Sequence, residues 1–159
     1  MAYKTYRSTK IAQQGDVDSL NISGELNLDH EERHLRRKLL HFDNGDMIMV
    51  DLKESVQLHD GSLLQAESGE FFRICAKSEP LYEARAKNPL HLLQLAWHLG
   101  NRHLSVEIFK DRITLLRDHV IRAMLEGLGA TVREIEAPFQ PLHGAYHEHS
   151  GGHGSRHHH

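Results

Sequence analysis

The sequence predicts an α+β protein in which an N-terminal all-β module is followed by a ferredoxin-like β-α-β-β-α-β domain and a disordered, His-rich tail. Short apolar runs separated by turn signals fill residues 1–75, a pattern that is typical of an all-β module. Residues 76–138 instead alternate strand-like runs with segments of helical periodicity. Residues 139–159 contain few apolar side chains, so burial cannot offset the entropy lost on ordering them.

The turns of the N-terminal module are marked by Gly beside Asp, Asn, Gln or Ser. Four such signals divide residues 1–75: Gln14–Asp16, Asp43–Asp46, His59–Gly61 and Ser68–Gly69. The runs between them alternate in polarity or are rich in β-formers, as in Ser19–Ile22 and Met47–Val50. We therefore expect short strands joined by tight turns.

The second domain begins with a predicted strand over Leu81–Ala86. Asn88 is then a suitable helix N-cap, and Pro89 occupies the first helical position. Helical spacing predicts one buried face from the apolar residues Leu92, Leu93, Leu95, Ala96 and Leu99. Gly100-Asn101 is expected to end this helix.

A hairpin and a second helix are predicted to follow. Leu104–Phe109 and Arg112–Leu116 read as paired strands around a turn at Lys110-Asp111. Asp118 is expected to cap a helix that ends at Gly129, with Ile121, Met124, Leu125 and Leu128 on its buried face. Thr131–Ile135 supplies the last strand, which completes the β-α-β-β-α-β order.

Composition restricts the class of protein. The formal net charge of −3 argues against nucleic-acid binding. The N-terminal ten residues lack the apolar segment of a signal peptide, and the apolar stretch Leu90–Leu99 is too short and too polar to span a membrane. The single cysteine, Cys75, lies in an apolar run and is expected to be a packed side chain in a reducing compartment. We therefore expect a cytoplasmic protein.

Histidine is over-represented, with 15 residues against 19 Lys and Arg together. Imidazole suits Ni, Cu and Zn, whereas the shortage of carboxylates in the tail disfavours Mg and Ca. A purification-tag remnant could account for residues 154–159 but not for the earlier tail histidines. The tail histidines that we take as candidate ligands are His143, His147, His149, His153, His157, His158 and His159.

Three further histidine positions are considered. His103 follows the first helix directly, and His119 follows the cap of the second. His30-Glu31-Glu32-Arg33-His34 matches H-E-x-x-H, which in zinc proteases requires a helix and a third ligand. Because of this match, a metal hydrolase is kept as a minor alternative function.

The second half of the chain resembles a known family. Gly100-Asn101-Arg102-His103, Asp118-His119-Val120 and Gly144-Ala145-Tyr146 before a His-rich tail are similar to motifs of the UreE urease accessory proteins. The resemblance extends to the first module through Asp29–Arg33 and Asp60-Gly61. It implies a peptide-binding-like first domain and a ferredoxin-like second domain that forms a homodimer.

The resemblance also implies a function. Members of this family are nickel metallochaperones, not enzymes, and they work with a urease accessory GTPase and the urease pre-activation complex. The resemblance assigns His103 as the primary nickel ligand, shared across the dimer axis, with tail histidines as auxiliary ligands. His119 matches a secondary site, but Arg117 replaces the histidine that accompanies it in some members. Zn(II) or Cu(II) are expected to bind in vitro. A passive nickel or zinc store remains the main competing interpretation.

Overall fold

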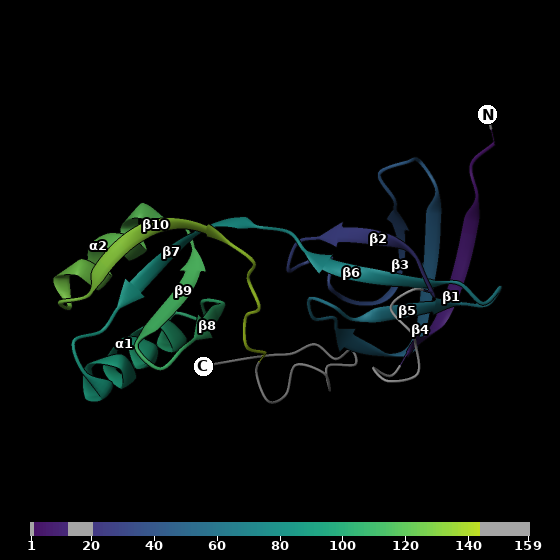
Figure 1. The fold of residues 1–159 in the computed structure, drawn as a ribbon. Coiled ribbons are helices and arrows are strands. Elements are labelled where there is room, and N and C mark those ends of the chain that lie inside the picture. Colours follow the sequence, from purple (N-terminus) through teal and green to yellow (C-terminus); the bar gives the residue numbers. More distant parts are fainter. Residues whose placement is uncertain (1, 13–20, 144–159) are drawn as a thin grey trace. The chain divides into compact units, whose positions relative to one another are not determined.

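The computed structural model describes residues 2–12 and 21–143, and it is an α+β structure with two separate sheets and two helices. The chain divides into two compact units. The first contains residues 1–79 and 137–139, and the second contains residues 80–136 and 140–159. Figure 1 traces both units along the chain. The α+β class predicted from the sequence is confirmed.

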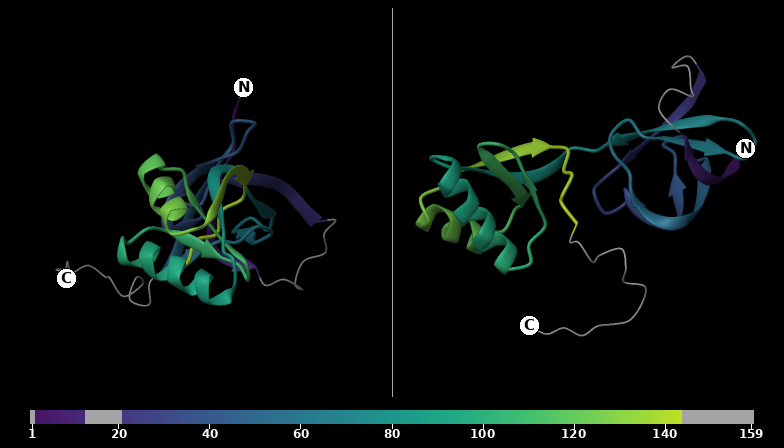
Figure 2. Two further views of the ribbon diagram at one scale, coloured as in Figure 1. Left: turned by 90° about the vertical axis from the view of Figure 1, so that its left-hand side faces the viewer. Right: turned by 90° about the horizontal axis from the view of Figure 1, so that it is seen from below.

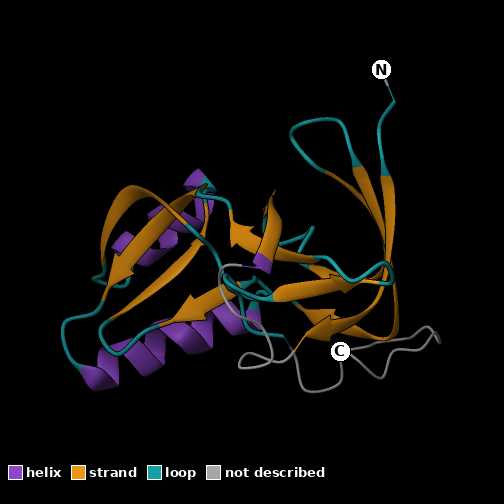
Figure 3. Cartoon of the chain, turned by 45° about the vertical axis from the view of Figure 1, so that its right-hand side comes forward, coloured by secondary structure: helices purple, strands orange, loops and turns teal. Residues whose placement is uncertain are grey.

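The first unit is built on a six-stranded sheet with the order β2-β6-β5-β1-β4-β3. Strands β1 and β4 pair in parallel, as do β2 and β6, and the remaining pairs are antiparallel. Figure 3 shows these strands in orange. Their bounds are Thr5–Ala12 (β1), Ile22–Leu28 (β2), His34–His41 (β3), Met47–Gln57 (β4), Leu63–Ala66 (β5) and Phe71–Ala76 (β6).

Three predicted turns in this unit contain a glycine with positive φ. Gly45, Gly61 and Gly69 have φ values of 97°, 92° and 105°, which residues with a Cβ rarely adopt. The fourth predicted turn, at residues 14–16, lies outside the described residues. The three glycine turns therefore separate β3 from β4, β4 from β5 and β5 from β6. The core of the unit consists of alternate strand residues, among them Leu26, Ile48, Val50, Leu64 and Ile74.

The second unit follows the predicted order of elements. Its four-stranded sheet has the order β10-β7-β9-β8, and both helices lie on one side of it (Figure 2, right). Tyr82 and Ala84 of β7 face Leu95 and Leu99 of the first helix in a common core. The bounds are Glu79–Arg85 (β7), Pro89–Asn101 (α1), Val106–Ile108 (β8), Arg112–Leu116 (β9), His119–Gly127 (α2) and Thr131–Ala137 (β10).

Both predicted N-caps are confirmed. The side chain of Asn88 accepts a hydrogen bond from the His91 backbone N–H at 2.8 Å, and Pro89 is the first residue of α1. The carboxylate of Asp118 accepts from the Val120 N–H at 2.9 Å and from the Ile121 N–H at 3.3 Å. These caps determine where each helix starts, and hence where His119 lies.

Two details of α1 differ from the prediction. Gly100 and Asn101 belong to the helix instead of ending it, and the cap is Arg102. Leu93 was expected on the buried face, but it is 67% exposed. Helical spacing alone could not distinguish it from Leu92 beside it, because adjacent residues differ by only 100° around the axis.

Candidate metal-binding site

His103 lies in the tight turn that follows α1. The His103 N–H donates to the Gly100 carbonyl at 3.0 Å, and the Leu104 N–H donates to the Leu99 carbonyl at 3.3 Å. The backbone reverses at His103, whose φ is 58°. Among the described residues it is the only non-glycine with positive φ, a conformation that costs a residue with a Cβ about 1–2 kcal/mol. The turn therefore holds the backbone of His103 in a defined left-handed conformation.

The His103 side chain is exposed and lines a cavity of about 300 Å³. Leu104, Leu115 and Ile121 give the cavity apolar walls. His103, Arg117 and Asp118 are the ionisable groups that line it. A ligand bound at His103 would thus be open to solvent on one side and bounded by a folded scaffold on the other.

Asp118 and Arg117 are engaged in the fold. The Asp118 carboxylate caps α2, as described above. The Arg117 guanidinium donates to the carbonyls of Leu81 and Ile135 at 3.2 and 3.0 Å. It also lies 3.5 Å from a carboxylate oxygen of Glu136. These contacts hold a cation two residues before His119.

His119 is the first residue of α2 and is exposed. In the described residues, no group of three or more His, Cys, Asp or Glu side chains is arranged to hold a metal ion. The auxiliary candidates His147, His149, His153, His157, His158 and His159 lie outside the described residues. His143 is the last described residue and is exposed.

The H-E-x-x-H match does not form a zinc-protease site. Residues 30–33 form a turn, and His34 begins strand β3, so the two histidines are not one helical turn apart. His30 is also engaged: its Nδ1 lies 2.7 Å from a Glu79 carboxylate oxygen, and its ring packs edge-on against Phe139 with centroids 5.1 Å apart. The metal-hydrolase alternative is therefore wrong.

Sequence reasoning missed an exposed apolar row on α1. Leu90, Leu93 and Trp97 are 63%, 67% and 64% exposed. Their spacing of three and four residues places them on one face of the helix that leads into His103. The sequence did contain a signal for this row, because α1 has apolar residues on nearly every side. One face of such a helix can be buried in the domain while another is left for a partner.

Comparison with known proteins assigns the chain to a family. The family model "UreE urease accessory protein, C-terminal domain" matches residues 79–159, and "UreE urease accessory protein, N-terminal domain" matches residues 10–77. The chain belongs to the UreE family. The resemblance found in the sequence motifs is thereby confirmed. In the described part of this UreE chain, no helix is both long and apolar enough to cross a lipid bilayer.

Similar UreE proteins extend over most of the chain. The urease accessory protein UreE of Rhizobium meliloti strain 1021 is 56% identical over 152 residues, which cover 96% of this chain and 98% of the relative. The UreE of Agrobacterium fabrum is 60% identical over 129 residues, covering 81% of this chain and 80% of the relative. The UreE of Rhizobium rhizogenes is 59% identical over 133 residues, covering 84% and 80%. All three are named as accessory proteins of urease, not as the enzyme.

Proposed function

We propose that this UreE protein is a metallochaperone that binds Ni(II) through His103 and delivers it for assembly of the urease metallocentre. The observation that carries the proposal is the presentation of one exposed imidazole on a fixed turn. Family membership supports the connection to urease maturation. The order of elements in the second unit, which is that of a ferredoxin-like split unit, provides the scaffold for the turn.

A single rigid ligand suits a carrier better than an enzyme. Structural metal sites surround the ion with a closed set of protein ligands, which makes release slow. One His103 per chain leaves most of the coordination shell to be filled by a second copy, by tail histidines or by water. Several tail histidines on one chain act at high effective concentration and can be displaced one at a time by a recipient. The affinity order of divalent ions predicts that Cu(II) and Zn(II) also bind in vitro.

We infer that the functional unit is a homodimer formed through the second unit. Leu90, Leu93 and Trp97 form an exposed apolar row on one face of α1, and a second copy would remove this row from water. Since α1 leads directly into the turn at His103, a symmetric contact on this face would bring two His103 side chains toward one axis. Each chain would then contribute one imidazole to a shared ion.

A calorimetric titration tests the role of His103. His103→Ala should remove the tightest nickel-binding step while the protein stays folded and keeps its oligomeric state, since the exposed side chain contributes little packing. His41→Ala is the matched control, because His41 is an exposed histidine at the end of β3, in the other unit. Unchanged tight binding in His103→Ala would refute the assignment.

The tail and the dimer are tested separately. Removal of residues 147–159 should lower the number of nickel ions bound without changing dimerisation. Leu93→Glu should shift the protein toward monomer in sedimentation equilibrium and weaken the tightest nickel step, because the shared ligand pair is lost. A stable dimer in Leu93→Glu would show that the row on α1 is not the interface.

The competing function is passive storage of nickel or zinc in the cytoplasm. A store acts alone, whereas a chaperone must contact its recipient. We expect the nickel-loaded protein to form a complex with the urease accessory GTPase and to transfer nickel to the urease pre-activation complex. Retention of nickel in the presence of both partners would favour storage.

A further inference from the structure

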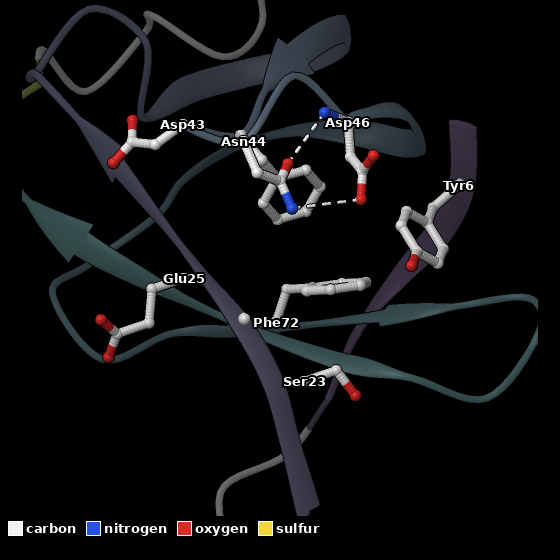
Figure 4. Close-up of a pocket in the computed structure, with 9 residues that line it drawn as sticks. Tyr6, Ser23, Glu25, Asp43, Asn44, Asp46 and Phe72 are labelled. Carbon is white, nitrogen blue, oxygen red and sulfur yellow. Dashed lines mark hydrogen bonds between the residues drawn. The ribbon is translucent and has the colours of Figure 1, made fainter. Parts of the chain in front are cut away.

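The first unit contains a pocket, whereas the proposed nickel site belongs to the second unit. It has a volume of about 230 Å³ and opens between β2 and the β3–β4 turn (Figure 4). Its lining is divided between three aromatic rings and three carboxylates. The lining residues are Tyr6, Ser23, Gly24, Glu25, Phe42, Asp43, Asn44, Asp46 and Phe72.

The aromatic rings form one connected wall. The Phe72 ring centroid lies 4.8 Å from that of Phe42 and 4.9 Å from that of Tyr6, so the three rings hold one another in place. Gly24 lets the backbone of β2 pass close to this wall, because a Cβ there would lie 3.3 Å from Cδ1 of Phe72. Phe72 is buried in the core, whereas Tyr6 and Phe42 are partly buried, so a ligand would meet chiefly the latter two rings. The π faces of such rings carry partial negative charge and attract cations.

The carboxylates add full negative charge at the rim. In Figure 4, Asp43 and Asp46 lie above the Phe72 ring on either side of Asn44, and Glu25 lies to the left of the ring. Glu25 pairs with Arg73, which is not part of the lining, at 3.2 Å. Within the described part of the chain, no ion pair joins Asp43 or Asp46 to a basic side chain, and no basic side chain lines the pocket.

The fold holds Asp46 in this position. Its backbone N–H donates to the Asn44 side-chain oxygen at 2.9 Å, and the Asn44 amide donates to its carboxylate at 3.3 Å. A second carboxylate oxygen accepts from the Lys4 backbone N–H at 3.0 Å. These contacts are to neutral donors, so the negative charge of Asp46 remains available to a ligand.

The strand beside the pocket can bind an extended chain. Ser23, Gly24 and Glu25 belong to β2, which is at the end of the sheet and pairs with β6 on one side only among the described strands. The backbone of an edge strand can add a further strand from a partner. A basic side chain of that partner would enter the pocket next to it.

We propose that this pocket binds the cationic side chain of a lysine or arginine in an extended segment of a partner polypeptide. The ring wall and the two uncompensated aspartates bind the charged group, and the β2 edge binds the backbone. This site is independent of His103, and its failure would leave the proposed nickel site untouched.

The test is a titration of the ¹⁵N-labelled full chain, kept metal-free with a chelator, with the capped peptide Ala-Ala-Lys-Ala-Ala. We expect weak saturable binding, with shifts confined to residues of the pocket and β2. The same peptide with norleucine in place of lysine should bind at least about fivefold more weakly, as loss of a cation–π and charge contact predicts. Equal binding of the norleucine peptide would overturn the proposal, and so would tighter binding of putrescine, which has the charge but no peptide backbone.

Variants locate the site. Asp43→Asn should weaken binding of the lysine peptide several-fold, because among the described residues that carboxylate accepts one long hydrogen bond, of 3.5 Å from Asn27. Phe42→Leu keeps an apolar side chain but removes a ring, and it should also weaken binding. Glu54→Gln, an exposed carboxylate on β4 outside the pocket, is the matched control. Wild-type affinity in both Asp43→Asn and Phe42→Leu, with unchanged thermal unfolding, would refute the assignment.

Discussion

Replacement of Arg33 by Met should strongly destabilise the first unit. Arg33 is fully buried, and its guanidinium donates to the carbonyls of Leu28 and Leu58 at 3.3 and 3.4 Å, and to that of Phe139. It also lies 3.9 Å from a carboxylate oxygen of Glu79, whose side chain is 10% exposed. Methionine keeps most of the apolar stem but removes every one of these donors.

The Leu28 carbonyl keeps a hydrogen bond from the Lys77 N–H at 2.8 Å, so the carbonyls that lose their donor are those of Leu58 and Phe139. The expected loss is about 3–5 kcal/mol, because each such acceptor costs about 1–3 kcal/mol and the buried Glu79 carboxylate loses its neighbouring cation. Urea unfolding followed by circular dichroism measures the free energy of unfolding. Hydrogen exchange should show faster exchange in strands β4 and β6 and little change in β9, which belongs to the second unit. Arg36→Met, at an exposed position on β3, is the control. A loss below about 1 kcal/mol, within the range of ordinary surface substitutions, would refute this reasoning.

Three further predictions concern single positions. His103→Gly should be about 1 kcal/mol more stable to urea than His103→Ala, because only glycine adopts the positive φ of this turn without strain, and equal stabilities would argue against the strain. Asp118→Ala should cost about 1 kcal/mol through loss of the α2 cap, and Asp118→Asn should recover most of it in the same unfolding assay. Burial, together with the charges of Glu25 and Asp60, raises the pKa of the Cys75 thiol. Alkylation of Cys75 by iodoacetamide should therefore be slower than that of glutathione at pH 8 and should rise at higher pH, and a faster rate would contradict the raised pKa.

Local signals predicted the second unit well. Each of its signals depends on residues that are close together in the sequence. The structure has the caps at Asn88 and Asp118 and the strand Arg112–Leu116 where the sequence indicated them. The end of α1 was misplaced because Gly100 was expected to supply the left-handed residue, whereas His103 does so. Composition drew attention to the tail, and the family resemblance, not periodicity, selected His103.

Long-range contacts were beyond sequence reasoning. Arg33 lies within the H-E-x-x-H match, where nothing in the local sequence indicates a core residue, yet it is completely buried. Its Phe139 partner is 106 residues away in the chain. Nothing in a local pattern indicates that three carbonyls and a carboxylate from distant segments will surround one guanidinium. The aromatic and acidic pocket was missed for the same reason, since its lining comes from β1, β2, β6 and the β3–β4 turn.

The short return of residues 137–139 to the first unit affects how the protein can be divided. A fragment that stops at residue 79 keeps all six strands but loses Phe139, which is fully buried and contacts His30 and Arg33. Such a fragment would have a cavity in its core. Low stability of the isolated first unit would therefore say little about the stability of that unit in the intact chain. Supplying residues 137–140 as a separate peptide, or joining them to residue 79 through a flexible linker, should restore the missing contacts. The boundary that matters for dissecting this protein is therefore set by packing and not by position along the sequence.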